Sequence, residues 1–149
     1  MSETLGSLCD KLTIVKLKQW HTTDPKKLKS LAAQKVLLEQ EIDQFVKDAF
    51  AGRMAIERIT FAANKVYKKR GNAVDAVNGE LGEMISRLAQ TNCALWHVQE
   101  KVYDFERVPN RKRCDVIKKL ALLNLERTQY IDAIDKKFLH HVIKKSRLR

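Results

Sequence analysis

Hydrophobic residues recur every three or four positions along most of the chain, which is the periodicity of amphipathic helices. The first stripe predicts a helix that ends at about His21 and contains Leu5, Leu8, Leu12 and Val15. A second helix is predicted after Thr23-Asp24-Pro25, because Asp24 can accept hydrogen bonds from the first free amides and Pro25 suits the first helical position. This second helix fades near Ala51-Gly52.

Three more helices are predicted in the rest of the chain. The third contains Ile56 and Ile59 and closes with Lys68-Lys69-Arg70-Gly71, where cations precede a glycine that can adopt the left-handed cap. The fourth begins at Leu81 and ends at Val108-Pro109-Asn110. The fifth runs from about Arg111 to Lys145, and its stripe consists of Ile117, Leu120, Ile131, Ile134, Phe138 and Val142.

Five helices joined by short links predict an all-α fold, an antiparallel helical bundle in one domain that spans residues 1–149. Glycine and proline are scarce, with five and two residues, which favours long helices over many short strands. Trp20-His21 and Trp96-His97 each precede a helix that begins at or near a proline. This echo leads to the further hypothesis that the bundle is built from a duplicated helical hairpin.

Positive charge is concentrated in the last third of the chain. The net charge is +11 at pH 7, and residues 107–149 hold thirteen Lys and Arg against four Asp and Glu. Such a local excess concerns partners rather than the fold, and it predicts a polyanionic partner such as nucleic acid. No helix-turn-helix or zinc-finger spacing accompanies it, and Tyr130 and Phe138 are interpreted as core residues rather than as platforms for bases. The predicted basic surface consists of Arg107, Arg111, Lys112, Arg113, Lys118, Lys119, Lys144 and Lys145.

Several features bear on the location of the protein. No segment reaches the ~18 uncharged apolar residues of a membrane span, and the first residues lack the basic stretch and apolar run of a secretory signal. Cys9, Cys93 and Cys114 are odd in number, widely separated and free of any CxxC pairing. They are interpreted as buried or half-buried free thiols in a reducing compartment. We therefore predict a cytoplasmic protein without a membrane span.

Polar residues interrupt the apolar stripes of the fourth and fifth predicted helices. They are Asn92, Trp96, His97, Glu100, Asn124 and Arg127. Buried polar atoms need partners, since an unpaired one costs roughly 1–3 kcal/mol. One interpretation is a Glu100–Arg127 pair with asparagine cross-links that fixes the register of the bundle; a ligand pocket or, less readily, a catalytic site are the alternatives. On the first helix, Asp10 and His21 share a face, and His21 is interpreted as a satisfied core histidine.

A set of short motifs resembles a known family. The motifs are Leu8-Cys9-Asp10-Lys11-Leu12-Thr13-Ile14 before Trp20-His21, Asn92-x-x-Leu95-Trp96-His97-x-x-Glu100, and Asn124-x-x-Arg127 before Ile134-Asp135. In these motifs the chain resembles the small helical bacterial proteins grouped as domain of unknown function 4254. The resemblance implies an all-α fold and genes near surface-polysaccharide genes, and it implies no established reaction. The chain departs from the family at Gln99-Glu100, where an acidic pair is typical, and at Tyr103, where a basic residue is common.

Three functional hypotheses follow. A non-catalytic module that binds a polyanion is favoured, with no cofactor and no metal. A protein-interaction or oligomerisation module is the alternative, because Leu122 and Leu125 lie away from the main stripe and need cover from this chain or from a partner. An all-α, magnesium-dependent nucleotide hydrolase is the third hypothesis, and its candidate ligands are Glu80, Glu83, Glu100 and Asp104.

Overall fold

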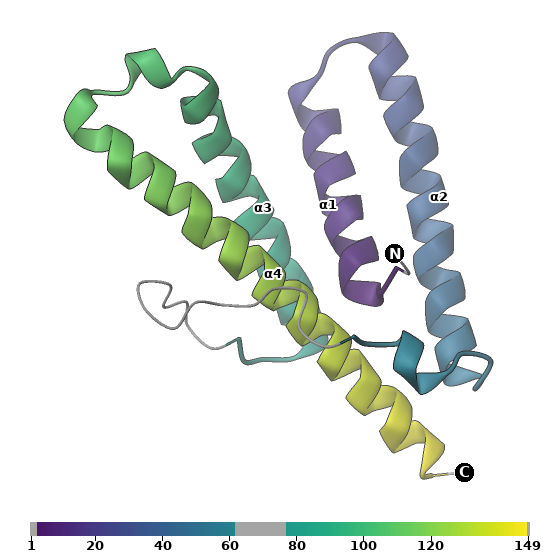
Figure 1. The fold of residues 1–149 in the computed structure, drawn as a ribbon. Helices are drawn as coiled ribbons and strands as arrows, with labels where there is room; N and C mark the ends of the chain where they lie inside the picture. The colour runs from purple at the N-terminus through teal and green to yellow at the C-terminus, as the bar shows by residue number, and fades with distance from the viewer. Residues whose placement is uncertain (1–2, 62–76, 149) are drawn as a thin grey trace.

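Four α-helices account for most of the residues that the structure describes. The computed structural model describes residues 3–61 and 77–148. Its helices are α1 (Leu5–His21), α2 (Pro25–Phe50), α3 (Leu81–Tyr103) and α4 (Asn110–Ser146), with the single 3-10 turns η1 (Ile56–Arg58) and η2 (Phe105–Arg107) (Figure 1). No strand occurs in these two ranges, so the all-α class is confirmed.

Local chemistry sets the starts of the first two helices. The Thr4 hydroxyl accepts a hydrogen bond from the Ser7 backbone N–H at 3.3 Å, and the Thr4 N–H donates to the Ser7 hydroxyl at 3.1 Å. This reciprocal pair satisfies amides that have no partner inside the helix. At the start of α2 the Asp24 carboxylate accepts from the Lys26 N–H at 2.9 Å, and Pro25 occupies the first turn. The predicted end of the first helix near His21 and both predicted ends of the second helix are confirmed.

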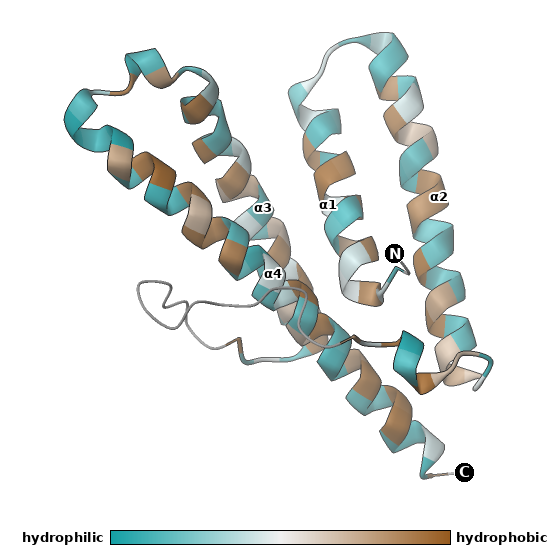
Figure 2. Cartoon of the chain, in the orientation of Figure 1, coloured by the Kyte–Doolittle hydropathy of each residue, from teal (hydrophilic) through white to brown (hydrophobic). Residues whose placement is uncertain are grey.

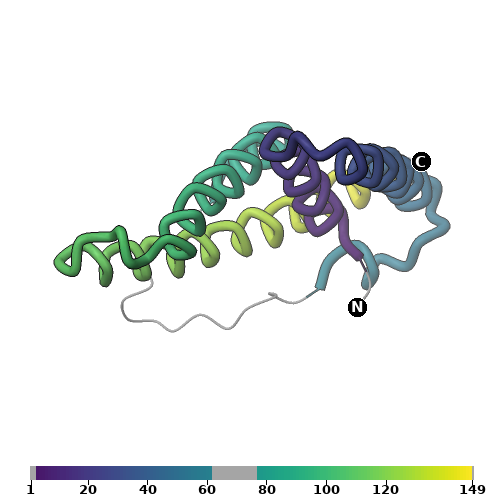
Figure 3. Tube along the Cα trace, turned by 90° about the horizontal axis from the view of Figure 1, so that it is seen from above, coloured from purple at the N-terminus to yellow at the C-terminus, as the bar shows by residue number. Residues whose placement is uncertain are grey.

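The helices form two antiparallel hairpins, α1–α2 and α3–α4. Helix α1 packs against α3 and α4 as well as against α2, whereas α2 has few contacts with α4. In Figure 1 the hairpins are close together near the N-terminus of α1 and diverge toward their loops. We call residues 97–120, at the loop end of the α3–α4 hairpin, the arm. Seen from above in Figure 3, the arm extends to one side of α1 and α2.

The hydrophobic core lies where the two hairpins converge. Hydrophobic and hydrophilic residues alternate along every helix, as Figure 2 shows, so each helix offers one apolar face. The Phe138 ring of α4 lies 6.0 Å from the Phe45 ring and 5.6 Å from the Phe50 ring, both at the end of α2. The most completely buried apolar residues are Leu8, Ile59, Leu88, Ile134 and Phe138.

Two predictions about the helices need correction. The predicted third helix contains Ile56 and Ile59, but there the chain forms only η1, and Ile59 packs fully buried into the core after this turn. The rest of that predicted helix, residues 62–71, lies outside the described residues. Ile117 was assigned to the buried stripe of the last helix, yet it is 53% exposed because it lies in the arm, beyond the reach of α1 and α2. Leu125, assigned to the other side, is buried.

The duplicated-hairpin hypothesis concerns origin and stays a hypothesis. Both Trp-His pairs lie at the same distance from the start of the first helix of their hairpin. The two hairpins differ in length, however, and α3 continues past its Trp-His pair while α1 ends there.

Helix α1 lies close to α4 at Gly6. A Cβ atom at this position would clash with the Ile131 carbonyl oxygen, so a larger residue would push the two helices apart. The Gly6 N–H donates to the Asp135 carboxylate at 2.7 Å. Burial raises the pKa of Asp135 to about 6, although the bonds from Gly6 and from the Thr4 side chain favour the charged form. A buried acid thus joins the first turn of α1 to α4.

The raised pKa of Asp135 predicts a pH-dependent stability. Asp135 holds its proton more tightly in the folded state than in the unfolded chain. This tighter proton binding stabilises the folded state fully below the ordinary pKa of 3.8, and the stabilisation is lost as the pH rises through about 6. Asp135→Asn keeps an acceptor for the Gly6 N–H and removes the titration. We expect the variant to gain up to about 3 kcal/mol relative to the wild type between pH 4 and pH 7. Urea unfolding across this range measures the difference.

Asp115→Asn, an exposed carboxylate on the same helix, is the matched control and should show no such trend. A constant difference between Asp135→Asn and the wild type at all pH values would contradict the assignment.

Candidate functional site

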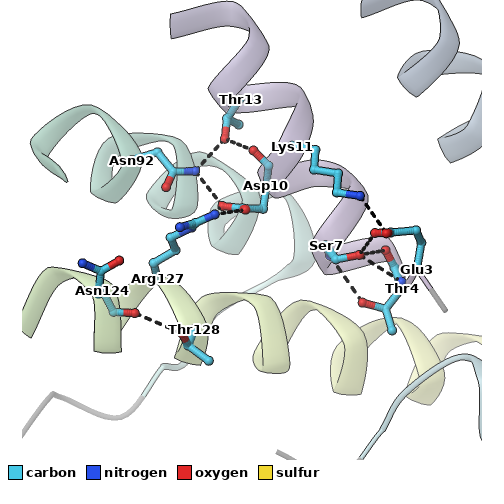
Figure 4. Close-up of polar contacts among 10 residues, drawn as sticks. All are labelled: Glu3, Thr4, Ser7, Asp10, Lys11, Thr13, Asn92, Asn124, Arg127 and Thr128. Carbon is cyan, nitrogen blue, oxygen red and sulfur yellow. Dashed lines mark hydrogen bonds and ion pairs between the residues drawn. The ribbon is translucent and has the colours of Figure 1, made fainter. Parts of the chain in front are cut away.

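Asp10 and Arg127 form a buried ion pair between α1 and α4. The Arg127 Nε donates to Asp10 Oδ1 at 2.8 Å, and the Arg127 Nη2 contacts Asp10 Oδ2, which makes the pair bidentate (Figure 4). The Asp10 side chain is 6% exposed and that of Arg127 is 34% exposed. The hydrogen bonds to Asp10 raise the pKa of Arg127 above its ordinary value, against the effect of burial. Bidentate carboxylate–guanidinium pairs are strong and directional.

Asn92 brings α3 into the same network. Its Nδ2 donates to Asp10 Oδ1 at 2.8 Å and to the Thr13 hydroxyl at 2.7 Å. Asn92 is 1% exposed, and its Oδ1 has no hydrogen-bond partner in the described part of the chain. Three helices therefore meet at Asp10, whose carboxylate accepts from both of the other two.

The predicted Glu100–Arg127 pair is wrong. Arg127 binds Asp10, and Glu100 lies at the base of the arm, where it accepts from the Trp96 Nε1 at 3.0 Å. Asn124 does not link helices either, since its Nδ2 donates to the Leu120 carbonyl of its own helix at 3.1 Å. Of the six residues predicted to share a pocket, Asn92 and Arg127 meet around Asp10 and the others lie elsewhere.

Trp96 and His97 belong to a second cluster, at the end of α1. The His21 ring stacks on the Trp96 ring with centroids 4.7 Å apart, and the His97 ring lies 6.1 Å from the His21 ring. His97 Nδ1 is 3.4 Å from Glu100 Oε2. The interpretation of His21 as a core histidine is wrong: the residue is exposed, and its Nδ1 bonds to the Leu17 carbonyl of the same helix. The last turn of α1 and one face of α3 thus join through aromatic rings.

Two hollows flank this aromatic cluster. The tip hollow, of about 400 Å³, lies between the end of α1, the start of α2 and Trp96, and its lining includes Lys18, His21 and Lys27. The arm hollow, of about 690 Å³, lies between the end of α3 and the start of α4. Its charged lining consists of His97, Glu100, Lys101, Asp104, Arg107 and Lys112. Lysines line both hollows, while carboxylates line only the arm hollow.

A third hollow lies at the opposite end of the molecule. It has a volume of about 720 Å³ and is enclosed by the end of α2, η1 and the last turns of α4. Apolar residues such as Phe50, Ile56 and Val142 line it, and Lys145 and Arg147 lie at its edge. The Lys145 Nζ is 4.8 Å from the centre of the Phe50 ring, so this cation already has a partner within the chain.

The residues of the predicted basic surface have different surroundings. Arg107 pairs with Asp104 at 3.1 Å, and Arg113 donates to the Val108 and Glu106 carbonyls while its guanidinium lies over Phe105. Lys144 and Lys145 lie at the far end of α4. The remaining four have exposed side chains that form no ion pair with the described part of the chain: Arg111, Lys112, Lys118 and Lys119.

The carboxylates of the magnesium hypothesis have separate partners. Glu80 pairs with Lys137, Glu83 with Arg87, and Asp104 with Arg107, while Glu100 contacts Trp96 and His97. Among the described residues no three His, Cys, Asp or Glu side chains are grouped so that they could hold a metal ion.

The cysteines differ in exposure, and the prediction for one of them needs correction. Cys9 is buried and Cys93 half-buried, as predicted, but Cys114 is exposed in the first turns of α4. Burial raises the pKa of the Cys9 thiol to about 11, and the nearby carboxylates of Asp135 and Asp10 add to this effect. The Cys9 thiol therefore stays protonated at neutral pH and is a poor nucleophile.

Comparison with protein-family models, with curated proteins and with solved structures finds no match to the chain. The resemblance to domain of unknown function 4254 stays a prediction. No helix in the two described ranges has both the length and the apolar character needed to cross a membrane. The cytoplasmic location likewise stays a prediction.

Asp10, Trp20 and Tyr103 were named from the sequence, but the contacts and exposure that the structure gives them were not predicted. Asp10 is the acceptor for Arg127, although 117 positions separate them in the chain. Trp20 and Tyr103 are 77% and 81% exposed, although the helical pattern gives no reason to expect solvent-exposed aromatic rings at these positions. The sequence gives only a weak indication that these rings are exposed. Three of the five residues before Trp20 are polar or charged, and Tyr103 lies between Lys101 and Asp104.

The buried pair predicts a strong coupling between its two partners. Arg127→Met leaves the Asp10 charge buried, and we expect a loss of about 3 kcal/mol in the free energy of unfolding, near the low end for broken buried pairs because water reaches Arg127. Asp10→Asn should cost less, since Asn92 and Arg127 keep an acceptor. The double variant should lose much less than the sum of the two single losses. Urea unfolding of the four proteins measures the coupling, and additive losses would contradict the pairing.

Proposed function

We propose that the protein is a non-catalytic module that binds a polyanion, in the first place nucleic acid, through the arm. The observation that carries the proposal is the set of four exposed cations without an ion-pair partner in the described chain, namely Arg111, Lys112, Lys118 and Lys119. Cations with no internal partner are available to neutralise phosphates, and each neutralised phosphate releases a counterion into solution.

The helical register supports a shared surface. Arg111 and Lys118 are seven positions apart, as are Lys112 and Lys119, so each pair falls on nearly the same face of α4, about 10.5 Å apart along the axis. The two pairs lie about 100° apart around the helix, which places all four on one side of it. Asp115 is the exposed carboxylate among them, and it offsets one of the four charges.

The arm hollow extends this surface to the end of α3. Lys112 lines the hollow together with Lys101 and Arg107. Lys144 and Lys145, by contrast, begin about 37 Å farther along α4 than Lys119, at 1.5 Å per residue. A short ligand on the arm does not reach them, so the eight residues of the predicted basic surface divide between two ends of the helix.

A self-association module is the second candidate, and one observation favours it. Val36 and Leu37 are 48% and 58% exposed in the middle of α2, the helix whose main contacts are with α1 alone. An uncovered apolar pair on a peripheral helix suits a contact with another protein surface. Replacement of both by serine should leave polyanion binding unchanged, which separates the two candidates.

Replacement of the four arm cations should weaken the salt-sensitive part of the binding. The variant Arg111→Gln, Lys112→Gln, Lys118→Gln and Lys119→Gln should bind a labelled oligonucleotide more weakly than the wild type. The slope of log affinity against log salt concentration should become shallower by about 3 for a single strand, because four phosphate contacts are lost. Fluorescence anisotropy between ~50 and ~200 mM salt measures both quantities.

A control with the same charge change keeps the test specific. Lys29, Lys47, Arg58 and Lys136 are exposed and lie away from the arm, and their replacement by glutamine lowers the net charge by the same amount. We expect this control to retain most of the affinity. Equal losses in the two variants, or no binding by the wild type at ~50 mM salt, would overturn the proposal.

A further inference from the structure

We infer that the nucleic acid bound is single-stranded, and that its bases stack on aromatic rings which follow the cations from the tip hollow to the arm. This inference rests on the proposed function and adds the class of nucleic acid to it. The observation behind it is the juxtaposition of exposed aromatic rings with cations at the loop ends of both hairpins.

Two of the aromatic rings are highly exposed to solvent. Tyr103 is 81% exposed in the last turn of α3, and Trp20 is 77% exposed in the last turn of α1. Large aromatic side chains ordinarily contribute to folding by burial, so these two contribute little to the core. Within the described chain, the Tyr103 hydroxyl accepts from the Gln99 Nε2 at 3.1 Å, and this contact leaves the faces of the ring open.

The register of α3 aligns a second ring with Tyr103. Trp96 lies seven positions earlier, on nearly the same face of the helix and about 10.5 Å away along the axis. One face of Trp96 is covered by the stacked His21 ring, which fixes its orientation, and its Nε1 is held by Glu100. Trp96 is half-buried and also lines the tip hollow, so part of its ring remains accessible there.

Cations accompany the rings on both sides. Lys18 and Lys27 line the tip hollow with Trp96. On the other side of the Trp96-His97 pair, Lys101, Arg107 and Lys112 line the arm hollow. A strand that passes from one hollow to the other meets lysines, then stacked rings, then lysines and arginines again. Alternation of backbone contacts and stacking platforms is the arrangement by which proteins hold single strands.

The carboxylates of the arm hollow do not oppose this path. Glu100 is held by Trp96 and lies 3.4 Å from His97, and Asp104 is paired with Arg107. The Asp104 charge is thus offset by Arg107, and the Glu100 oxygens are engaged by the Trp96 and His97 side chains. Asp24, near the tip hollow, is engaged by the first amides of α2.

A duplex does not use the aromatic rings. Its bases are stacked on one another, so their faces are not available to Trp96 or Tyr103, and only the cations contribute. A single strand uses both. The structure therefore assigns a preference for single strands that cations alone do not provide.

The chain carries its own reporters for the test. Trp20 and Trp96 are its two tryptophans. Titration with a 20-nucleotide oligothymidylate should quench tryptophan emission on binding, whereas a 20-base-pair duplex should bind more weakly and leave the emission nearly unchanged. The variants Trp20→Phe and Trp96→Phe each leave one reporter, and they show which ring the strand meets.

Tyr103→Ala tests the stacking contribution directly. Because the side chain is so exposed, the variant should fold normally, as circular dichroism checks. We expect at least about a fivefold loss of affinity for the oligothymidylate, the lower bound for one base–aromatic stack, and little change for the duplex. Leu37→Ala, an exposed apolar residue on α2, is the matched control and should change neither affinity.

The outcomes separate the two proposals. If neither nucleic acid binds at ~50 mM salt, the proposed function fails. If both bind with equal affinity, tryptophan emission stays unchanged and Tyr103→Ala binds as the wild type does, polyanion binding stands and the inference of a single strand is overturned.

Discussion

The buried carboxylate of Asp10 is the constraint on which the arrangement of the helices depends. An ionised group this deeply buried needs partners, and it obtains them from α4 through Arg127 and from α3 through Asn92. Helix α1 thereby holds both helices of the other hairpin, while α2 has few contacts with α4. A second buried acid, Asp135 of α4, accepts a hydrogen bond from the Gly6 N–H in the first turn of α1. Polar groups thus fix how the two hairpins meet.

This constraint also shapes the surface. With α1 held near the middle of α4, the hairpins diverge toward their loops, and the arm lacks the cover that a four-helix bundle gives along its whole length (Figures 1 and 3). Ile117 and Tyr103 are exposed for this reason. In the arm, exposed cations therefore lie near an exposed aromatic ring, that of Tyr103.

The sequence predicted the fold well where local chemistry decides it. Asp24 and Pro25 mark the start of α2 through contacts within one turn, and these two residues were recognised in the sequence. The Thr4 cap of α1 also acts within one turn, but it was not predicted. The prediction for Ile56 and Ile59 was wrong because helical spacing does not distinguish a helix from a single turn whose last residue packs into a distant core. Periodicity reports a buried face, and it does not report how many turns follow.

The candidate site was predicted less well because it depends on how helices cross. Asn92 and Arg127 were recognised as misplaced polar residues, but Arg127 was paired with Glu100 instead of Asp10, since the crossing of α1 over α4 cannot be read from either helix alone. Exposed cations were predicted from composition, while the open rings of Trp20 and Tyr103 were not, because burial is the ordinary state of such side chains. Only the packed structure shows which aromatic residues remain uncovered.

We propose that the ligand binds at the loop ends of the hairpins and not at the far end of α4. Amide chemical-shift mapping of the labelled protein with and without an oligothymidylate tests this most directly. We expect the shifts to concentrate between Trp96 and Lys119 and around Trp20 to Lys27. Shifts centred on Lys144 to Arg147, or spread evenly over the helices, would contradict it.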